Sequence, residues 1–386
     1  MMADVPRDPN SGAAGTEFQT MQALRRLGHD VDELWSDSLP RRIRHGNLHY
    51  LLELPSAYRN AMRDGLERKP YEVIHINQPH GYLAAKALGR SGSGAVFIHR
   101  SHGFESRVET DLKPWRDKYD GNGNDRPLSR KVMSSALTRA LSYHCRSIAR
   151  HADGHIVSAT QCRDFLHSQM GVPIERIAVI PQAAAPSFLE RPAPAMTAAR
   201  LGRVLYVGQY TFSKAPMIAA AAINQLSNRD RRLEFTWVCS SKHHSQVREM
   251  LNPAARVRLT LLDWMPQHDL MQVYDSHGIF LFPSFFEGFG KVFLEAMSRG
   301  LCVIAADNGG AHDVITHEVD GLLTQTGSVE GAAKSCLRLV NRPEEAIAIS
   351  SAAVATANRY TWDRAAKGTA AFYEDRIEAK RRELQR

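Results

Sequence analysis

Short runs of β-branched and apolar residues alternate along this chain with longer stretches of helical periodicity. Repeated strand–helix alternation predicts parallel sheets with helices on both faces, because parallel strands need long crossover connections. The candidate strands fall into two sets. The first set is Val31–Trp35, Glu72–Asn77, Ala95–His99, His155–Ser158 and Ile177–Pro181, and the second is Val204–Val207, Glu234–Cys239, Val257–Leu262, Gly278–Phe282 and Cys302–Ala306.

The segments between these strands include four clear helical patterns, which are Thr16–Leu27, Ser129–His151, Lys214–Leu226 and Val292–Arg299. A chain of 386 residues is too long for one hydrophobic core and suits two domains. An Ala/Pro-rich stretch, Gln182–Gly202, separates the two strand sets and has the composition of a linker. We therefore expect two Rossmann-like α/β domains.

One segment of the first half, Arg107–Arg130, has little periodicity and contains the polar run Gly121–Asp125. Loops of this length are usually functional or disordered. We expect a long mobile loop inserted in the first domain.

Composition excludes several classes of protein. No apolar run is long enough to span a bilayer, and the residues after Met1 do not resemble a signal peptide. The five cysteines lie far apart and form neither a disulfide-like spacing nor a C-x-x-C pair, so buried thiols in a reducing compartment are expected. These features favour a cytoplasmic protein.

The net charge of +8 lies mainly in the first half, where residues 1–150 hold 23 Lys and Arg against 17 Asp and Glu. A basic face there could contact anionic lipid or an acidic acceptor, which predicts a possible peripheral location at the inner membrane face. A solvated surface explains the same charge equally simply. No nucleic-acid-binding signature is present, so no nucleic-acid partner is expected.

The strongest chemical signal follows the strand that ends at Phe282. A tight segment, Glu287-Gly288-Phe289-Gly290, precedes a helix that carries Glu295, and a second strand is followed by Asn308-Gly309-Gly310. Glycines before a helix let the backbone approach a ligand, and the helix N-terminus favours an anion. Two such turns at the carboxyl ends of parallel strands predict a nucleotide-binding crevice.

The run Pro283-Ser284-x-x-Glu287-x-Phe289-Gly290, followed by Glu295-Ala296-Met297 and Gly300, resembles glycosyltransferase family 4. Gly208 with Lys214 in the second half is a further specific similarity, whereas Gly15-Thr16-Glu17 and His99–Gly103 in the first half are weaker ones. The resemblance covers nearly the whole chain. It implies the GT-B fold, in which two Rossmann-like parallel-sheet domains face a central cleft and a C-terminal helix crosses back to the first domain.

On this basis the expected boundaries are an acceptor-side domain at 1–185, a linker at 186–200, a donor nucleotide-sugar domain at 201–361 and the returning helix at 362–386. The implied reaction is retaining transfer of a hexose from a nucleotide diphosphate sugar to a hydroxyl of a glycan, lipid or small molecule. The resemblance implies no cofactor and no obligatory metal.

The implied catalytic residues are His102, Lys214 and Glu287. The implied donor-binding residues are Gly15, Gly208, Gln209, Lys214, Glu287, Gly288, Phe289, Gly290, Lys291 and Glu295. Lys214 would stabilise the leaving diphosphate, Glu295 would hold the ribose hydroxyls, and Glu287 would orient the sugar.

Each of these residues also has a structural explanation. The two glutamates could lie on a solvated helix face, Lys214 could be a surface lysine at a helix start, and His102 could be packed at a strand end. Gly15 could simply shape a turn.

The chain departs from the family pattern at two positions. Gln209 stands where an arginine is usual, so one positive charge expected at the diphosphate is missing, and Lys291 or Arg299 could replace it. Asp313 stands where glutamate is usual. Three alternatives stay open: a nucleotide-sugar epimerase of the same architecture, a degenerate non-catalytic nucleotide-sugar-binding protein, which Gln209 would indicate, and a glycan phosphorylase, which would need a lysine for pyridoxal phosphate in the second domain.

The start of the chain is unusual for a Rossmann-like domain, which normally opens with a central strand. Here only Met1–Val5 precede Pro6 and the expected glycine loop Ser11–Gly15. We expect that most of the first strand lies upstream of this sequence, or that Met1–Val5 form a shortened strand.

Overall fold

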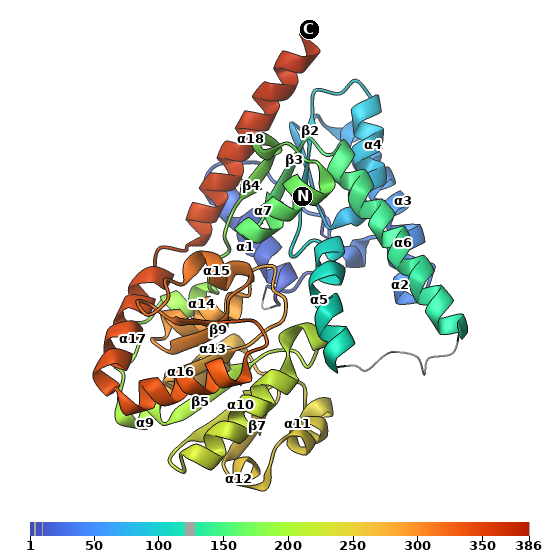
Figure 1. Ribbon diagram of the computed structural model, residues 1–386. Helices are drawn as coiled ribbons and strands as arrows, with labels where there is room; N and C mark the ends of the chain where they lie inside the picture. Colours follow the sequence, from blue (N-terminus) through green and yellow to red (C-terminus); the bar gives the residue numbers. More distant parts are fainter. Residues whose placement is uncertain (4, 10, 120–127, 386) are drawn as a thin grey trace. The chain divides into compact units, whose positions relative to one another are not determined.

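The structure, a computed structural model, describes residues 1–3, 5–9, 11–119 and 128–385. The chain divides into two compact units, which are coloured along the sequence in Figure 1. The first unit comprises Met1–Pro181 together with Trp362–Arg386, and the second comprises Gln182–Thr361. The last helix therefore belongs with the first unit, although the whole second unit precedes it in the sequence.

The first unit is built on a parallel sheet in the order β1-β2-β3-β4, with strands Val73–Asn77, Val96–Arg100, Gly154–Val157 and Ile177–Val179. Its helices are α1 (Ala13–Arg26), α2 (Gly46–Leu48), α3 (Leu54–Arg68), α4 (Tyr82–Arg90), α5 (Glu105–Tyr119), α6 (Leu128–His151), α7 (Thr160–Met170) and α18 (Trp362–Leu384). Short 3₁₀ turns lie at Ser36–Ser38, Pro79–Gly81 and Ile174–Arg176, and a π-helical turn, η2, spans His49–Glu53.

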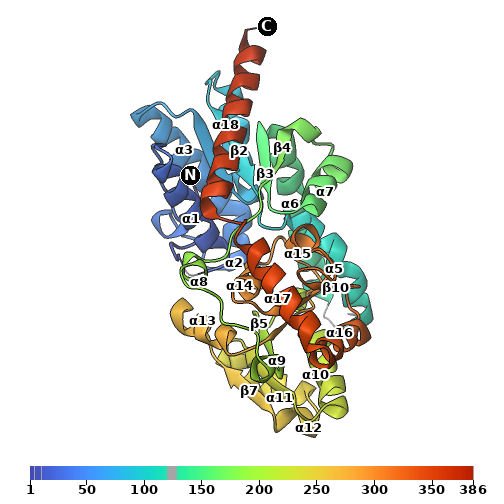
Figure 2. The ribbon, with the colours of Figure 1, turned by 90° about the vertical axis from the view of Figure 1, so that its left-hand side faces the viewer.

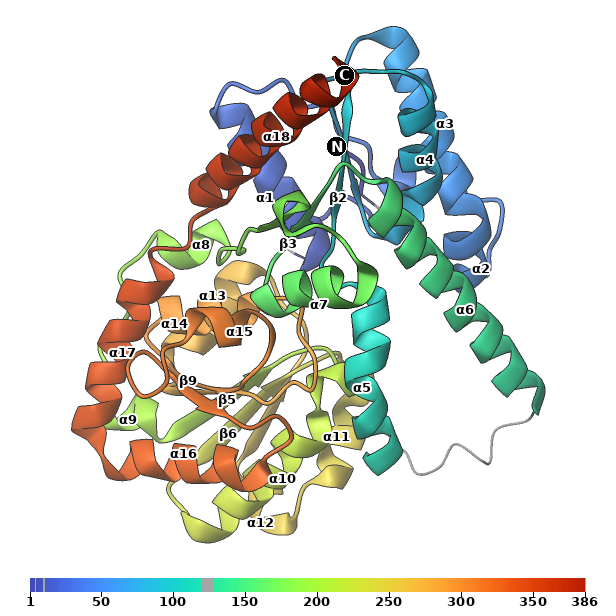
Figure 3. The ribbon, with the colours of Figure 1, turned by 45° about the horizontal axis from the view of Figure 1, so that its top comes forward.

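Helices cover both faces of this first sheet. Figure 3 shows α1 and α18 on one side of β2, and α3 and α4 on the other. Apolar residues of α3, α4 and α6 pack against Ile74 and Ile76 of β1 and Phe97 of β2. On the opposite face α1 and α18 lie side by side (Figure 2). There Phe372 of α18 packs so closely on Gly154 that a Cβ at Gly154 would lie 2.8 Å from its ring.

The N-terminus forms a short stub beside β1. The amide of Met2 donates to the carbonyl of His75 (2.8 Å), and Met2 forms parallel bridges to both Leu34 and Ile76. The expected strand Val31–Trp35 does not form, since its pairing is limited to the bridge at Leu34. The pairing of Met2 fits the alternative of a shortened strand.

The prediction of a loop at Arg107–Arg130 is wrong for its first half, which forms part of helix α5. This helix buries little apolar surface beyond Leu112, so its hydrophobic pattern is weak. Local ion pairs support it, including Arg107 with Asp111 four residues later (2.9 Å). The run Gly121–Asp125 lies outside the described residues.

The second unit is built on a parallel sheet in the order β10-β9-β8-β5-β6-β7. Its strands are β5 (Arg203–Val207), β6 (Glu234–Val238), β7 (Leu259–Leu262), β8 (Ile279–Phe282), β9 (Cys302–Ala306) and β10 (Leu322–Thr324). Its helices are α8 (Pro186–Leu189), α9 (Ala198–Leu201), α10 (Pro216–Arg229), α11 (His244–Met250), α12 (Pro253–Arg256), α13 (Gln267–Asp275), α14 (Lys291–Ser298), α15 (Gly309–Val314), α16 (Val329–Asn341) and α17 (Pro343–Ala357), with 3₁₀ turns η6 (Phe212–Lys214) and η7 (Ser241–His243).

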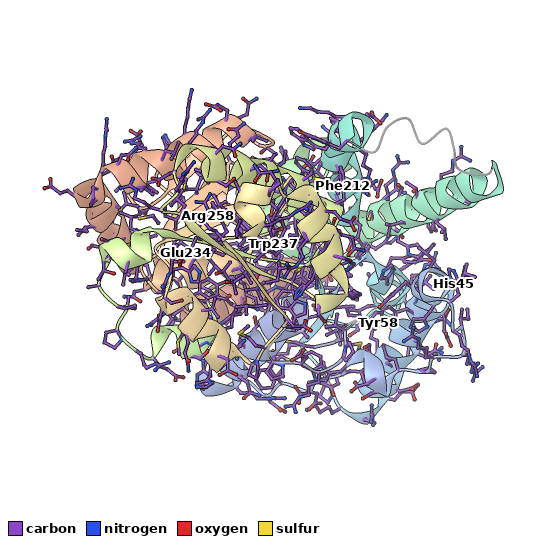
Figure 4. The ribbon with its side chains drawn as sticks, turned by 90° about the horizontal axis from the view of Figure 1, so that it is seen from below. His45, Tyr58, Phe212, Glu234, Trp237 and Arg258 are labelled. Atoms are coloured by element: carbon purple, nitrogen blue, oxygen red, sulfur yellow. The ribbon has the colours of Figure 1, made fainter. Side chains whose placement is uncertain are left out.

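Alternate residues of these strands enter two separate apolar clusters, as the period of two in a strand requires. One cluster joins Val204 and Trp237 to α10 and α16, and the other joins Leu205 and Phe280 to α13, α14 and α17. Trp237, labelled in Figure 4 among densely packed side chains, is fully buried and lies 4.3 Å from the Tyr206 ring. The sheet is therefore apolar on both faces.

The Ala/Pro-rich stretch predicted as a linker is held against the second unit. Arg299, almost fully buried, donates to the carbonyls of Arg191 (2.7 Å) and Pro192 (3.0 Å). Arg200, which lies within the stretch, donates to the carbonyls of His277 (3.0 Å) and Arg299 (2.8 Å) outside it. Two buried arginines thus hold this stretch in place through hydrogen bonds to backbone carbonyls.

All five cysteines are buried thiols, as expected from their spacing. Within the described residues, no helix combines the length and hydropathy needed to cross a bilayer.

Candidate active site

The candidate donor site lies at the carboxyl ends of three neighbouring strands of the second sheet, β5, β8 and β9. Gly208 follows β5, the segment Pro283–Gly290 follows β8, and Asn308 follows β9. The η6 turn after β5 is joined to the β8 segment, because the amides of Phe285 and Phe286 both donate to the carbonyl of Ser213 (2.9 and 3.2 Å). Phe212 of η6, labelled in Figure 4, packs on Phe285 (5.4 Å between rings).

Lys214 and Glu287 form the central pair of this site. The ammonium Nζ of Lys214 donates to Oε1 and Oε2 of Glu287 (2.7 and 2.9 Å). Glu287 is buried and also accepts from the Ser284 hydroxyl (2.8 Å), whereas Lys214 is partly exposed. An ammonium has three N–H donors, so Lys214 can contact an anionic ligand while it remains bonded to Glu287.

Three glycines hold the turns of the site against one another. A Cβ at Gly309 would lie 2.6 Å from Cβ of Glu287, and one at Gly310 would lie 2.4 Å from the Phe289 ring. Gly290 has a φ of +93° and directly precedes α14. Only glycine, which has no Cβ, lets the two turns approach so closely. This close contact fixes the backbone position of Glu287.

Glu295 lies two turns into α14 and is buried beside Tyr274. Burial raises the pKa of Glu295, and the positive charge of Lys291 and the neighbouring amide of Ala185 partly oppose that rise. Because Glu295 is buried, it is not part of a solvated helix face.

The remaining predicted donor residues lie around the same edge. Gly208 is buried, Gln209 is exposed, and Lys291 is the first residue of α14. Arg299 cannot replace the missing arginine, because its guanidinium is bound to Asp275 (2.6 Å) and to backbone carbonyls. Of Lys291 and Arg299, the two residues suggested to replace the missing arginine, only Lys291 lies at the site.

The residues predicted in the first unit lie at the carboxyl end of its sheet. Gly15 is not in a loop, because α1 already begins at Ala13, and the two alanines there favour helix over turn. His102 follows β2, and its Nε2 lies 3.1 Å from Oε1 of Glu17. His75 and His99 are buried within the sheet.

Sequence reasoning missed three residues of these sites. Ser284 lies in the motif but received no role, and Asn308 donates to the carbonyl of Ser284 (2.8 Å). Glu17 stood in the weak N-terminal motif, where its burial could not be seen. Among the described residues, no three His, Cys, Asp or Glu side chains gather as metal ligands do.

The family described as "Glycosyl transferase 4-like domain" matches residues 12–183, and "Glycosyl transferases group 1" matches residues 202–342. The chain belongs to the family 4 glycosyltransferases. The two matches fall on the two structural units, so both halves of this family 4 chain carry the family's sequence pattern.

Curated relatives of this family 4 chain include D-inositol 3-phosphate glycosyltransferases. The Saccharomonospora viridis enzyme is 31% identical over 219 residues, covering 54% of this chain and 49% of the relative. The Frankia alni enzyme is 26% identical over 327 residues, covering 80% and 75%. The chain spans about half the length of the first curated relatives it matches.

Among solved structures, sucrose-phosphate synthase from Thermosynechococcus elongatus has a TM-score of 0.74 at 19% identity, covering 98% of both chains. The catalytic domain of starch synthase IV from Arabidopsis thaliana, bound to ADP and acarbose, has a TM-score of 0.70 at 14% identity, again covering 98% of both chains. Anabaena HepE, in complex with UDP and glucose, has a TM-score of 0.66 at 16% identity, covering 96% and 97%. Together with the two parallel-sheet units, these likenesses give this family 4 glycosyltransferase the GT-B fold.

Proposed function

We propose that the protein transfers a hexose from a nucleotide diphosphate sugar to an acceptor hydroxyl, with retention of anomeric configuration. The observation that carries this proposal is the pairing of Lys214 with buried Glu287 at the carboxyl ends of β5 and β8. Ligands of open α/β sheets bind at that edge. Solved structures of the same fold in complex with UDP or ADP support a nucleotide as a ligand of this fold.

In this proposal the diphosphate lies between Lys214 and the N-terminus of α14. The remaining N–H of Lys214 and the backbone amides after Glu287 face the anion, and Lys291 adds a second positive charge. Glu295 accepts the ribose hydroxyls. Glu287, Phe289 and Gly290 orient the sugar, the last two through their backbone amides.

Catalysis in this arrangement is electrostatic. Negative charge grows on the diphosphate as its bond to the sugar breaks, and a fixed ammonium with oriented amides stabilises that charge without a reorganisation cost. We propose that these groups suffice without an obligatory metal. We assign no carboxylate nucleophile. His102 contacts the donor sugar or the reacting region.

We also propose that the first unit contacts an anionic membrane surface from which a lipid acceptor is drawn. The supporting observation is a patch, here called the α2 patch, in which exposed leucines stand beside exposed basic residues. The α2 patch consists of Arg41, Arg42, Arg44, His45, Leu48 and Leu52, and Leu52 is 63% exposed. His45 is labelled in Figure 4. Basic residues beside apolar ones are typical of surfaces that bind anionic lipid. A cytoplasmic location stays a prediction.

The test is a thermal-shift panel of nucleoside diphosphates and their sugars, followed by product analysis with the donor that binds. A ligand at 100 times its dissociation constant stabilises a protein by about 2.7 kcal/mol. Because the curated relatives are named for D-inositol 3-phosphate, that compound begins the acceptor panel. Isomerised donor without acceptor would indicate an epimerase, and binding without turnover would indicate a binding protein.

A further inference from the structure

Glu17 is a fully buried carboxylate in the first unit that lies beside the side chains of Arg100 and His102. It lies on α1, and its Oε1 is 3.5 Å from Nε of Arg100 and 3.1 Å from Nε2 of His102. Both neighbours come from the carboxyl end of β2, one at its last residue and one in the following turn. Glu17 therefore joins the first helix to the segment that carries His102.

Glu17 has a guanidinium partner, Arg100, in addition to His102. Burial alone would raise the pKa of Glu17, but Arg100 and then His102 lower it to about 2, so the carboxylate is ionised. Arg100 is itself fully buried and donates to the Thr20 hydroxyl (3.0 Å). Since one buried guanidinium compensates one buried carboxylate, the contact with His102 calls for another explanation.

The contact between Glu17 and His102 is close but not well aligned. Within the described residues, neither oxygen of Glu17 nor Nε2 of His102 has a partner in hydrogen-bond geometry. Buried polar groups in proteins are nearly always paired, so such a group needs a reason. Catalytic hydrogen bonds are often long or poorly aligned before substrate binds and tighten afterwards.

We propose that Glu17 is a positioning residue that fixes the orientation and tautomer of His102. The inference rests on the role proposed for His102 above. An ionised carboxylate 3.1 Å from Nε2 repels a lone pair there, so the ring proton lies on Nε2. Nδ1 of neutral His102 is then an acceptor, ready for a hydroxyl of the bound sugar. The His102 side chain is 12% exposed, which leaves room for one such contact.

The first test needs no variant of Glu17. In protein labelled with ¹⁵N-histidine, long-range ¹H–¹⁵N spectra distinguish the two neutral tautomers, and the His102 signals are assigned by their loss in His102→Asn. We expect the Nε2–H tautomer for His102. A dominant Nδ1–H tautomer would overturn the proposal.

The second test is a double-mutant cycle on turnover. Glu17→Gln keeps the shape of the side chain and removes its charge, and we expect kcat to fall roughly 10- to 100-fold, the scale of losing the partner that orients an imidazole. In a His102→Ala background the same change should leave kcat unaltered, because Glu17 acts only through His102. An equal loss in both backgrounds would show a merely structural role.

Thr20→Val is the matched control, since it removes another buried bond of Arg100 without touching Glu17 or His102. We expect a lower melting temperature with unchanged kcat. If Glu17→Gln does not fold, the tautomer measurement on the wild-type protein still tests the proposal. If no donor is turned over, the proposed function fails while the tautomer of His102 is still measurable, so the two failures are distinguishable.

Discussion

The two parallel sheets of this protein are built from different residues. In the first unit β1, β2 and β3 bury the histidines His75, His99 and His155, whereas the strands of the second unit bury Phe280, Trp237 and other apolar residues in both faces. Rings of His99 and His155 face each other across neighbouring strands, with their Nδ1 atoms 3.1 Å apart. A sheet with buried imidazoles is stable only while these rings are neutral.

The candidate sites of the two units also differ in how their polar groups are paired. The second unit presents a compact pair, Lys214 with Glu287, on a rigid apolar sheet, and its turns are held by glycine contacts. The first unit presents a buried polar group around Glu17 whose hydrogen bonds are incomplete. Lys214 and Glu287 are thus bonded to each other without a ligand, whereas Glu17 and His102 lack a hydrogen bond of good geometry.

The largest expected effect is on acid stability. Burial lowers the pKa of His75, His80 and His155 to about 3 and that of His144 to about 4, and it lowers that of His99 as well. Among the described histidines of the second unit, only His277 shows such a shift, to about 4.

These histidines are neutral in the folded state but take up protons when unfolded below about pH 6.5. Stability is therefore complete above pH 6.5 and falls as pH decreases toward 3–4, by about 1.4 kcal/mol per pH unit for each histidine. Calorimetry from pH 7.5 to 4.5 should show the first unit unfolding earlier. Limited digestion with pepsin at low pH, followed by identification of the fragments, shows which unit unfolds first. Cleavage of the second unit before the first would contradict the comparison.

The next effect concerns turnover. Lys214→Ala should lower kcat by about 100-fold or more, because a preorganised charge at the leaving group is lost. The matched control is Lys69→Ala, which removes a lysine that is also paired with carboxylates, Asp30 and Asp32 (3.0 and 2.9 Å), but in the first unit. The control should retain normal kcat. A near-normal kcat in Lys214→Ala would show that Lys214 is a surface lysine without a role in turnover.

A smaller effect is expected on nucleotide affinity. Glu295→Gln should weaken binding of the nucleoside diphosphate by roughly 1.5–3 kcal/mol, the worth of a hydrogen bond to a charged group. Titration calorimetry with the 2′,3′-dideoxy nucleotide sharpens the test, since the variant should no longer distinguish it from the natural one. Glu344→Ala, an exposed glutamate of the same unit, is the control. If Glu295→Gln still binds the natural nucleotide more tightly than the dideoxy nucleotide, Glu295 does not hold the ribose hydroxyls.

The smallest effect concerns the α2 patch of the first unit. Arg42→Ser should weaken binding to anionic vesicles by about 1 kcal/mol, or roughly fivefold. Arg232→Ser, an exposed arginine of the second unit, is the control. Flotation that is equal with anionic and neutral vesicles would reject the membrane contact.

The strands of both units were predicted equally well. Strands β1 to β9 all lie within one or two residues of their predicted bounds, because each is a short run rich in β-branched and apolar residues, whereas the three-residue β10 was too short to notice. In the first unit α5 was missed because ion pairs, not apolar periodicity, support it. Val31–Trp35 has the composition of a strand, yet only Leu34 is bridged.

The candidate site shows the same limit. The resemblance to family 4 singled out Glu287, Glu295 and Lys214, because the motifs that carry it are short and local in sequence. It could not show that Arg299 is occupied by backbone carbonyls, nor that Glu17 reaches His102, since both depend on contacts between residues far apart in sequence. Those contacts are set by tertiary packing.

The most direct test of the central claim is to follow the wild-type protein by ¹H NMR with the nucleotide sugar that gives the largest thermal shift, together with the acceptor panel. We predict that nucleoside diphosphate appears in equal amount with one new glycoside, whose anomeric configuration matches that of the donor. An isomerised donor, an inverted product, or a tightly bound donor that no acceptor consumes would contradict the account.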